Sequence, residues 1–181
     1  MKENIKLGIY EGAAALAALL VLVFCALPSF VCSGYTLSHY QLIFGYTGKG
    51  PNGLLIFGFI LVVLSFLIAL AGSLLSFLDK RSIVRLSDDK TSMISGIVGG
   101  LFLLAGGIIL TCAILITGLD KENSELGLIQ GNWSIGPSNY LVLVFTLIGF
   151  AASYPSALVV LHHQDLLEKK TKKTAKESAA K

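Results

Sequence analysis

Charge is what this sequence has least of. Only 14% of its 181 residues are charged, whereas soluble domains average about 25%. The charged residues lie in short clusters between long apolar runs, and 54% of all residues are hydrophobic. Runs of about 20 apolar residues are typical of helices that cross a lipid bilayer. The composition therefore argues against an ordinary soluble domain and favours an integral membrane protein.

Lysine and arginine are absent from four apolar segments, which we interpret as membrane-spanning helices. The segments run from about Leu7 to Val31, Leu54 to Leu78, Met93 to Thr117 and Tyr140 to Leu161. A cleaved signal peptide is the alternative for the first segment, but its apolar run exceeds the about 7–15 residues of a signal core. The predicted fold is therefore an all-α integral membrane protein with four transmembrane helices.

Basic residues are also scarce in two of the loops. Only Lys49 and Lys121 lie after the first and third spans, and every other Lys and Arg lies in the N-terminal segment, the middle loop or the tail. The positive-inside rule then predicts a multi-pass protein of the cell membrane with both termini in the cytoplasm. Residues 167–181 are expected to form a Lys-rich, disordered cytoplasmic tail. The net charge of +3 reflects this topology and gives no support for nucleic-acid binding.

A repeat stands out against the apolar background, because LIFGYTGKGPNGLL (residues 42–55) is echoed by LIQGNWSIGPSNYL (residues 128–141). The matching positions are Leu42, Ile43, Gly45, Gly50 and Pro51 in the first copy and Leu128, Ile129, Gly131, Gly136 and Pro137 in the second. Each copy leads into a span, where Pro suits the first helical turn. Asn52 and Ser138 are expected to accept hydrogen bonds from the N–H groups of that turn.

We interpret the repeat as a tandem duplication of a helical hairpin. The copies cover about 7–80 and 93–166, within one membrane domain of residues 1–166. Because both hairpins enter from the same side, they would be parallel repeats related by a pseudo-two-fold axis along the membrane normal.

Small residues predict how the helices pack, because lipid tails are as apolar as Leu and helices associate through close backbone approach. Glycines recur at helical spacing in the first and third spans. The predicted helix-packing residues are Gly8, Gly12, Gly96, Gly99, Gly100, Gly106 and Gly107. We expect these two spans either to face each other or to line the tight centre of the bundle.

Ionisable side chains within the spans are few. Glu11 is the only acidic residue inside a predicted span, and an ionisable group in the membrane is a candidate functional residue. It follows Lys6 closely, so anchoring at the inner interface is favoured over a transport role. His39 lies in the first outer loop without a ligand cluster, and we expect it, like His162 and His163, at headgroup level. No metal site is predicted.

Reactive motifs are lacking as well. The sequence contains no Gly-rich phosphate loop, Ser/His/Asp arrangement, HExxH or CxxC, so we expect neither an enzyme nor a cofactor. Of the three cysteines, Cys32 and Cys112 could form a disulfide only if their backbones lie close together. We favour buried cysteines that act as small packing residues.

The four-span layout is similar to that of claudin-like and other tetraspan proteins in topology. The first outer loop has neither the Trp nor the paired Cys of the claudin pattern, so no residue roles carry over. We expect a small polytopic membrane protein that acts as an accessory subunit or scaffold, in contact with the lipid bilayer and with a membrane-protein partner or further copies of itself. The alternative is a small transporter or channel, as a single chain or as an oligomer, with a path between the two hairpins.

Overall fold

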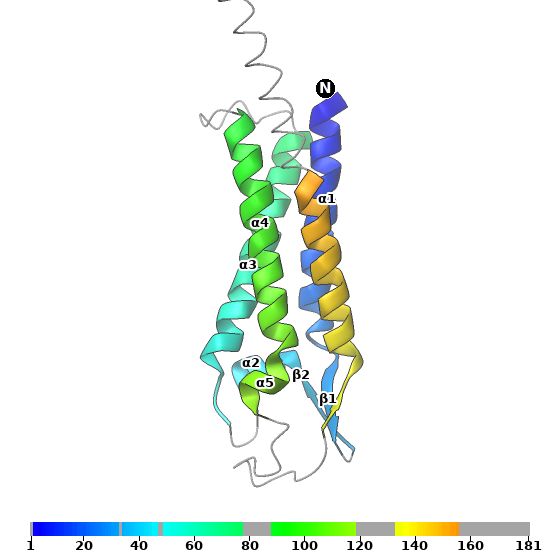
Figure 1. Ribbon diagram of the computed structural model, residues 1–181, viewed down its shortest axis with the longest axis vertical. Coiled ribbons are helices and arrows are strands. Elements are labelled where there is room, and N and C mark those ends of the chain that lie inside the picture. The colour runs from blue at the N-terminus through cyan, green and yellow to red at the C-terminus, as the bar shows by residue number, and fades with distance from the viewer. Residues whose placement is uncertain (1, 33, 47–48, 78–87, 119–132, 156–181) are drawn as a thin grey trace, which may run out of the picture.

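The computed structural model has four long described helices. They run side by side, and a small sheet lies at one end of them (Figure 1). The structure describes residues 2–32, 34–46, 49–77, 88–118 and 133–155. We call the end with the strands the sheet end and the opposite end the N-terminal end. The elements in chain order are α1 (Lys2–Phe24), β1 (Pro28–Cys32), β2 (Tyr35–Ser38), α2 (His39–Phe44), α3 (Gly53–Phe77), α4 (Asp88–Thr111), α5 (Ala113–Thr117), β3 (Ser134–Ile135) and the last helix (Pro137–Pro155).

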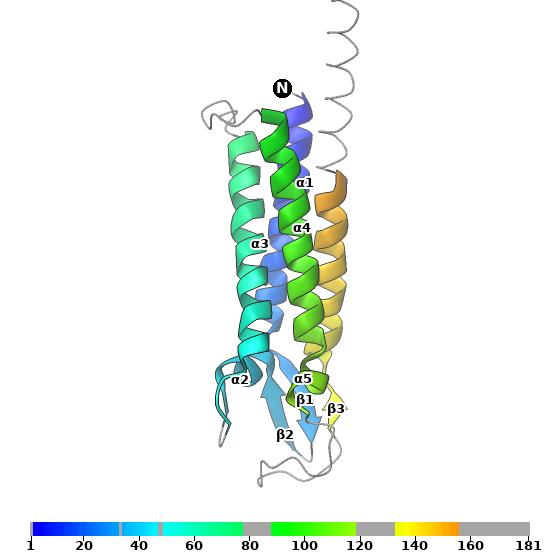
Figure 2. The same ribbon diagram turned by 60° about the vertical axis from the view of Figure 1, so that its left-hand side comes forward.

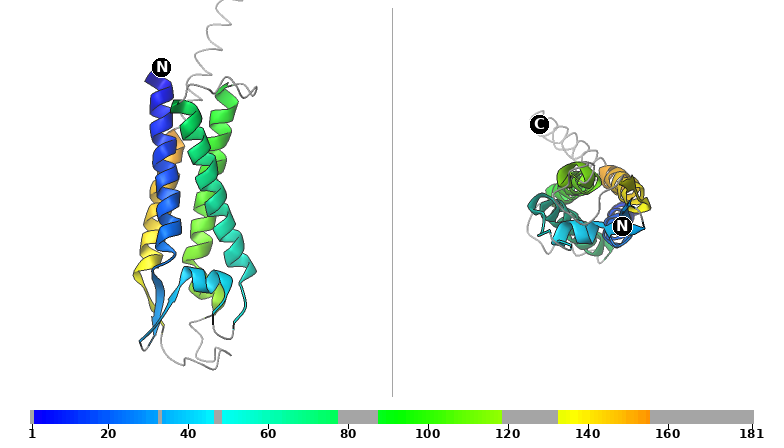
Figure 3. Two further views of the ribbon diagram at one scale, coloured as in Figure 1. Left: turned by 180° about the vertical axis from the view of Figure 1, so that it is seen from behind. Right: turned by 90° about the horizontal axis from the view of Figure 1, so that it is seen from below.

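The long helices form a ring in which chain neighbours are also neighbours in space. α3 packs along α1 on one side and along α4 on the other. The last helix closes the ring between α4 and α1, as the view along the bundle shows (Figure 3). α1 and α4 therefore lie diagonally opposite each other and make few direct contacts.

Three of the helices are long and apolar enough to cross a membrane, namely Ile5–Phe24, Gly53–Phe77 and Pro137–Pro155. α4 contributes a shorter apolar stretch, Gly96–Thr111. The chain is thus mostly helical, and its apolar helices indicate a multi-pass integral membrane protein.

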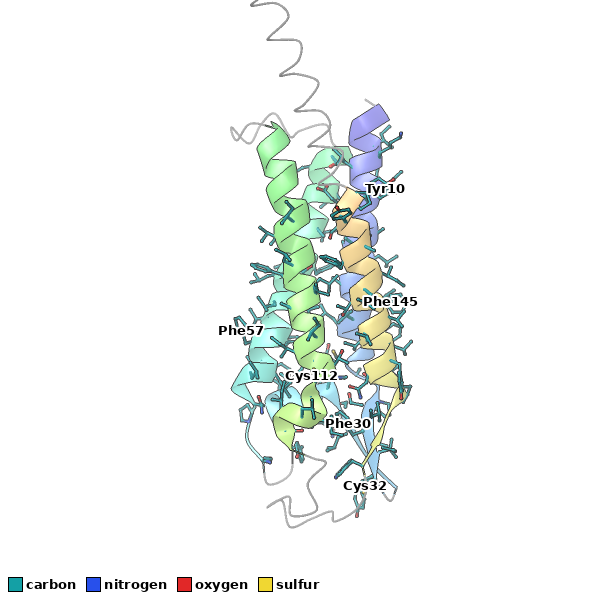
Figure 4. All side chains as sticks on the ribbon, viewed as in Figure 1. Tyr10, Phe30, Cys32, Phe57, Cys112 and Phe145 are labelled. Atoms are coloured by element: carbon teal, nitrogen blue, oxygen red, sulfur yellow. The ribbon has the colours of Figure 1, made fainter. Side chains whose placement is uncertain are left out.

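The outer surface of the ring is apolar. Leu16 of α1, Leu67 of α3 and Leu147 of the last helix are each at least half exposed, and Phe57 projects from α3 away from the bundle (Figure 4). Side chains of this kind suit contact with lipid tails, and their exposure would be costly in water. The described helices therefore carry a lipid-facing surface.

Two predicted spans differ in extent from the helices that form. The first was expected to continue to Val31, but α1 ends at Phe24 and the chain turns into β1 at Pro28. Proline has no N–H for a helical hydrogen bond, so it favours this early end. The third was expected to reach Thr117, but the α-helix is interrupted at Cys112 between α4 and α5.

A three-stranded antiparallel sheet makes the all-α prediction too narrow. Its order is β2-β1-β3, so the strand from the second loop pairs with the first strand of the first loop. Phe30 in the central strand lies opposite Leu37 on one side and Ile135 on the other. The sheet therefore joins two loops that are far apart in the sequence (Figure 2).

The short helix α2 closes the first loop over the helix ends. It begins with a capping box, in which Ser38 and Gln41 satisfy each other's backbone N–H groups. It ends at Gly45, whose φ of +105° favours glycine. A Cβ on Gly45 would also lie 2.8 Å from the carbonyl oxygen of Lys49. This glycine lets the chain fold back tightly toward α3.

The main hydrophobic core lies toward the sheet end. Phe30, Leu42, Ile43 and Leu110 are fully or almost fully buried there, so β1, α2 and α4 share one core. A smaller cluster of Ala14, Ala15 and Ala69 packs nearer the N-terminal end. Alanines allow the backbones of α1 and α3 to approach closely at this level.

The two cysteines considered for a disulfide lie on different elements. Cys32 ends β1 and Cys112 stands at the break between α4 and α5 (Figure 4). These two described residues are not joined by a disulfide.

Candidate functional site

A buried histidine joins three parts of the chain at the sheet end. His39, the first residue of α2, has no solvent exposure. Its Nε2 lies 3.1 Å from the carbonyl oxygen of Leu110 in α4, and its Nδ1 lies 2.9 Å from Ser138 Oγ in the last helix. Nδ1 also contacts the hydroxyl of Ser29 in β1. We call His39, Ser29, Ser138 and Asn139 the His39 junction.

Three further hydrogen bonds complete this junction. The side-chain amide of Asn139 donates to the carbonyl oxygen of Ser29 at 2.6 Å, and the Gly136 N–H donates to the same oxygen at 2.7 Å. The Ser138 hydroxyl donates to the carbonyl oxygen of Phe24 at 2.6 Å, where α1 ends. The junction thus connects α1, β1, α2, α4 and the last helix.

The neutral form of His39 suits these contacts. A carbonyl oxygen accepts only, so Nε2 carries the proton that it donates to Leu110, and Nδ1 is left to accept from a hydroxyl. Burial lowers the pKa of His39 from 6.5 to about 4, although the hydrogen bond to Leu110 and the side chain of Asn139 act in the opposite direction. The imidazole is therefore uncharged near neutral pH and has a structural role.

The sequence did not predict that His39 is buried within the protein. Its partners come from β1, α4 and the last helix, and no local pattern around His39 points to them. The one available signal was the set of small polar residues, Ser29, Ser138 and Asn139, next to the predicted span ends.

The second polar cluster surrounds Glu11, near the N-terminal end. Glu11 is only 2% exposed, so its side chain is buried within the protein, and its role at the inner interface stays a prediction. Its carboxyl group lies on the backbone of α3, where a Cβ on Gly72 would come within 2.9 Å of Cδ and Oε2. Ser76 Oγ lies 3.1 Å from Oε2. Glycine at position 72 thus makes room for the carboxyl group between α1 and α3.

A cavity with a volume of about 10 Å³ borders Glu11 inside the bundle. This volume admits about one water molecule. All four long helices contribute to its walls, including Ser65 of α3, Gly99 of α4 and Ser153 of the last helix. We call it the Glu11 cavity.

The predicted packing glycines lie at contacts with α3 and the last helix. Gly8 and Gly12 of α1 face Ser76 and Ser73 of α3, respectively. A Cβ placed on either glycine would lie 3.2 Å from the side chain of the serine that it faces. The Ser73 hydroxyl donates to the Gly8 carbonyl oxygen at 2.9 Å. The small residues of α1 therefore adjoin hydroxyl groups of α3.

The glycines of α4 divide between two neighbours. A Cβ on Gly106 would lie 2.6 Å from the carbonyl oxygen of Gly58 in α3, while Gly99 leaves ordinary space beside Ile68. Gly100 and Gly107 lie directly against side chains of the last helix, Ser153 and Thr146 respectively. Gly96 lines the Glu11 cavity.

The two copies of the repeat motif have different surroundings where the structure describes them. Leu42 and Ile43 are buried in the core, while Gly50 has open space around it and Pro51 is exposed. Gly136 lies directly against the carbonyl group of Pro28, and Pro137 is the first residue of the last helix. The remaining motif positions, Leu128, Ile129 and Gly131, lie outside the described residues, as do His162, His163 and the tail 167–181.

The helix starts that follow the motif also differ. Asn52 Oδ1 accepts hydrogen bonds from the N–H groups of Leu54 and Leu55, at 3.1 and 3.2 Å, as expected for an N-cap. Ser138 instead donates its hydroxyl hydrogen to the Phe24 carbonyl oxygen, and its oxygen lies 2.9 Å from His39 Nδ1. In the second copy, the serine that follows the Gly-Pro pair therefore belongs to the His39 junction, whereas in the first copy Asn52 caps its own helix.

A groove of about 300 Å³ lies between the first loop and α5 at the sheet end. Tyr46, Lys49 and Thr117 supply polar groups to its walls, and Leu42 and Ile116 supply apolar ones. Within the described part of the chain, no group of three His, Cys, Asp or Glu side chains is placed to hold a metal ion.

No family model matches this chain, and no curated protein matches it either.

Proposed function

We propose that this chain is a four-span protein of the cell membrane that acts as an accessory subunit or scaffold. In this proposal α4, with its apolar stretch Gly96–Thr111, is the fourth crossing. The N-terminal end lies in the cytoplasm and the sheet end lies outside, in agreement with the distribution of Lys and Arg. The partner is another membrane protein or a further copy of this chain.

The observation that carries this proposal is the ordered surface that the three-stranded sheet forms at the sheet end. β1 is paired on both sides, and the His39 junction holds this region to the helix ends with buried hydrogen bonds. Large side chains remain exposed on it, including Tyr35 at 60% and Ile135 at 51%. A rigid surface with exposed aromatic and aliphatic groups suits recognition, because little conformational entropy is lost on binding.

A transport role is the weaker candidate. A transporter needs a polar path, and the Glu11 cavity has room for about one water molecule. The described side chains around it are mostly small and apolar.

Purification from native membranes in mild detergent, with mass spectrometry of the associated proteins, tests the contact role. We expect a stoichiometric membrane-protein partner that is lost when Tyr35 and Ile135 are both replaced by Ser. Replacement of the lipid-facing Leu67 and Leu147 by Ala is the matched control and should keep the partner. Recovery of the chain alone would contradict the accessory role and direct attention to flux assays.

The orientation can be tested by labelling intact cells with a membrane-impermeant maleimide. The Lys49→Cys variant should react without permeabilisation, and the Lys6→Cys variant only after it. The opposite pattern would place the sheet end in the cytoplasm and overturn the proposed topology.

We also propose that the two hairpins arose by duplication. The Gly-Pro pairs before α3 and the last helix support this, as does the ring of four helices that alternate in direction (Figure 3). An experimental structure in which residues 7–80 and 93–166 do not superpose would reject it.

A further inference from the structure

The groove between the first loop and α5 combines hydrogen-bond donors with a positive charge. Its volume of about 300 Å³ lies at the lower end of the range for ligand sites, about 300–1,000 Å³, so it suits a small polar group. Lys49 contributes an exposed side chain with an ammonium group. The described residues that line the groove include no Asp or Glu. A negatively charged group therefore fits this site better than a cation.

Two further side chains of the groove are available as donors. Asn52 directs its side-chain oxygen to the N–H groups of Leu54 and Leu55, so its amide NH2 group is left to donate to a ligand. Tyr46 also lines the groove, and its hydroxyl is buried without a hydrogen-bond partner among the described residues. An oxygen atom of a ligand is a suitable partner for such a hydroxyl. Together with Lys49, these groups suit an anion with several oxygen atoms, such as a phosphate group.

Backbone hydrogen bonds hold the wall that carries these donors. Tyr46 and Lys49 exchange two of them, at 3.1 and 2.8 Å, and the Asn52 N–H donates to the Ile43 carbonyl oxygen at 3.0 Å. The backbone positions of the three donor residues are thus fixed before a ligand binds. Little conformational entropy of the backbone is lost on binding as a result.

The place of the groove indicates that a lipid supplies the phosphate group. Asn52 directly precedes α3, and Leu54 and Phe57 near the start of α3 are half exposed. Phe57 projects away from the bundle on the side where the chain runs from α2 to α3 (Figure 4). The groove therefore lies where the lipid-facing surface of α3 begins, which is the level of phospholipid headgroups when α3 crosses a membrane. The N-terminus of α3 adds a partial positive charge at the same level.

We propose that this groove binds the headgroup of an anionic phospholipid. The phosphate oxygens accept hydrogen bonds from Lys49, Asn52 and Tyr46, and the acyl chains extend along the lipid-facing surface of α3. The Thr117 hydroxyl donates to the Ala113 carbonyl oxygen at 2.7 Å, so its own oxygen is able to accept from a hydroxyl of the headgroup. Phosphatidylglycerol has both a phosphate and headgroup hydroxyls. The site requires that α3 crosses the membrane, but it is independent of the partner binding proposed above.

Native mass spectrometry of the full chain in detergent, titrated with phosphatidylglycerol, tests the proposal. We expect one molecule to be retained, with higher affinity than phosphatidylcholine, which has no net charge and no headgroup hydroxyl. Lys49→Gln should weaken the binding about tenfold or more, because a hydrogen bond to a charged group is lost. Lys6→Gln, on an exposed lysine of α1, is the matched control and should bind as the wild type does. Equal affinities of the two variants, or no retained lipid, would overturn the proposal.

Two other variants separate lipid binding from folding. Asn52→Asp keeps an oxygen for the N–H groups at the start of α3, but it removes the amide donor and adds a negative charge to the groove. Tyr46→Phe removes a hydroxyl that has no partner among the described residues. Both variants should unfold at the temperature of the wild type and bind phosphatidylglycerol several-fold more weakly. Unchanged lipid affinity in both would contradict the assigned donors.

Competition distinguishes a lipid from a free anion. Inorganic phosphate and glycerol phosphate carry the same charged group without acyl chains, so neither should displace phosphatidylglycerol at equal concentration. Displacement by inorganic phosphate would show that the groove is a site for a free anion and would overturn the assignment to a lipid. None of these outcomes affects the accessory role, because that role is measured by the loss of a protein partner when Tyr35 and Ile135 are replaced.

Discussion

His39 Nδ1 lies 2.9 Å from the hydroxyl oxygen of Ser138, a residue 99 positions later in the chain. The first of these residues begins α2 and the second stands in the first turn of the last helix. Because the same imidazole also contacts Leu110 in α4, one side chain fixes the first loop to both helices of the second half.

Replacement of His39 by Leu should destabilise the protein by about 3 kcal/mol. Leucine has a similar volume but leaves the Leu110 carbonyl and the hydroxyls of Ser29 and Ser138 without the imidazole, and each buried polar group left unpaired costs about 1–3 kcal/mol. Thermal or SDS-induced unfolding in detergent measures the change. Tyr35→Phe, on an exposed side chain, is the control and should alter stability by less than about 0.5 kcal/mol. Equal stability of both variants would show that the junction is not structural.

Stability should fall as the pH decreases from about 6.5 to about 4. The pKa of His39 is lowered to about 4 in the folded protein, so between these values the unfolded chain binds more protons than the folded one. The stabilisation is fully present above pH 6.5 and amounts to about 3 kcal/mol, since one pKa unit corresponds to about 1.4 kcal/mol. The difference in unfolding free energy between wild type and His39→Leu, measured across this range, isolates the effect. A difference that stays constant with pH would contradict it.

The two glycines that precede proline in the repeat should respond very differently to alanine. A Cβ on Gly136 would overlap the Pro28 carbonyl group, and the Gly136 N–H bond to Ser29 would be displaced. We expect Gly136→Ala to cost about 2 kcal/mol or more. Gly50 has open space around it, so Gly50→Ala should be tolerated. Unfolding in detergent checks both, and equal costs would mean that the β1 to β3 contact is not required.

The glycines of α4 should also divide into sensitive and tolerant positions. Gly106→Ala places a Cβ 2.6 Å from the Gly58 carbonyl oxygen. A backbone atom cannot move aside cheaply, so a loss of about 1–3 kcal/mol is expected. Gly99→Ala meets Ile68 at 3.4 Å, an ordinary contact, and should be nearly neutral. A neutral Gly106→Ala would show that α3 and α4 pack less closely than the structure has them.

The long helices could be predicted from sequence because the signal is local. The stretch Gly53–Phe77 has no charged residue over 25 positions. Its length and apolar composition are enough to predict a helix that crosses a lipid bilayer. The strand β3 could not be predicted, since a strand of two residues, Ser134 and Ile135, has no pattern of its own and depends on pairing with β1.

The polar clusters were missed for a related reason. The burial of Glu11 depends on the absence of a side chain at Gly72, a residue on another helix. The burial of His39 depends on hydroxyl and carbonyl groups from three other elements. Such contacts form only when the helices have assembled, so they cannot be predicted from the hydropathy along the chain.

The pairing of β1 with β3 also sets an order on biogenesis. β1 leaves the ribosome early, and its neighbour β2 follows within a few residues, so that hairpin can form at once. Its second neighbour is synthesised about a hundred residues later, directly before the last helix. Completion of the sheet therefore requires that the second loop has been made, and a chain truncated before β3 would present an unpaired strand edge for quality-control factors to recognise.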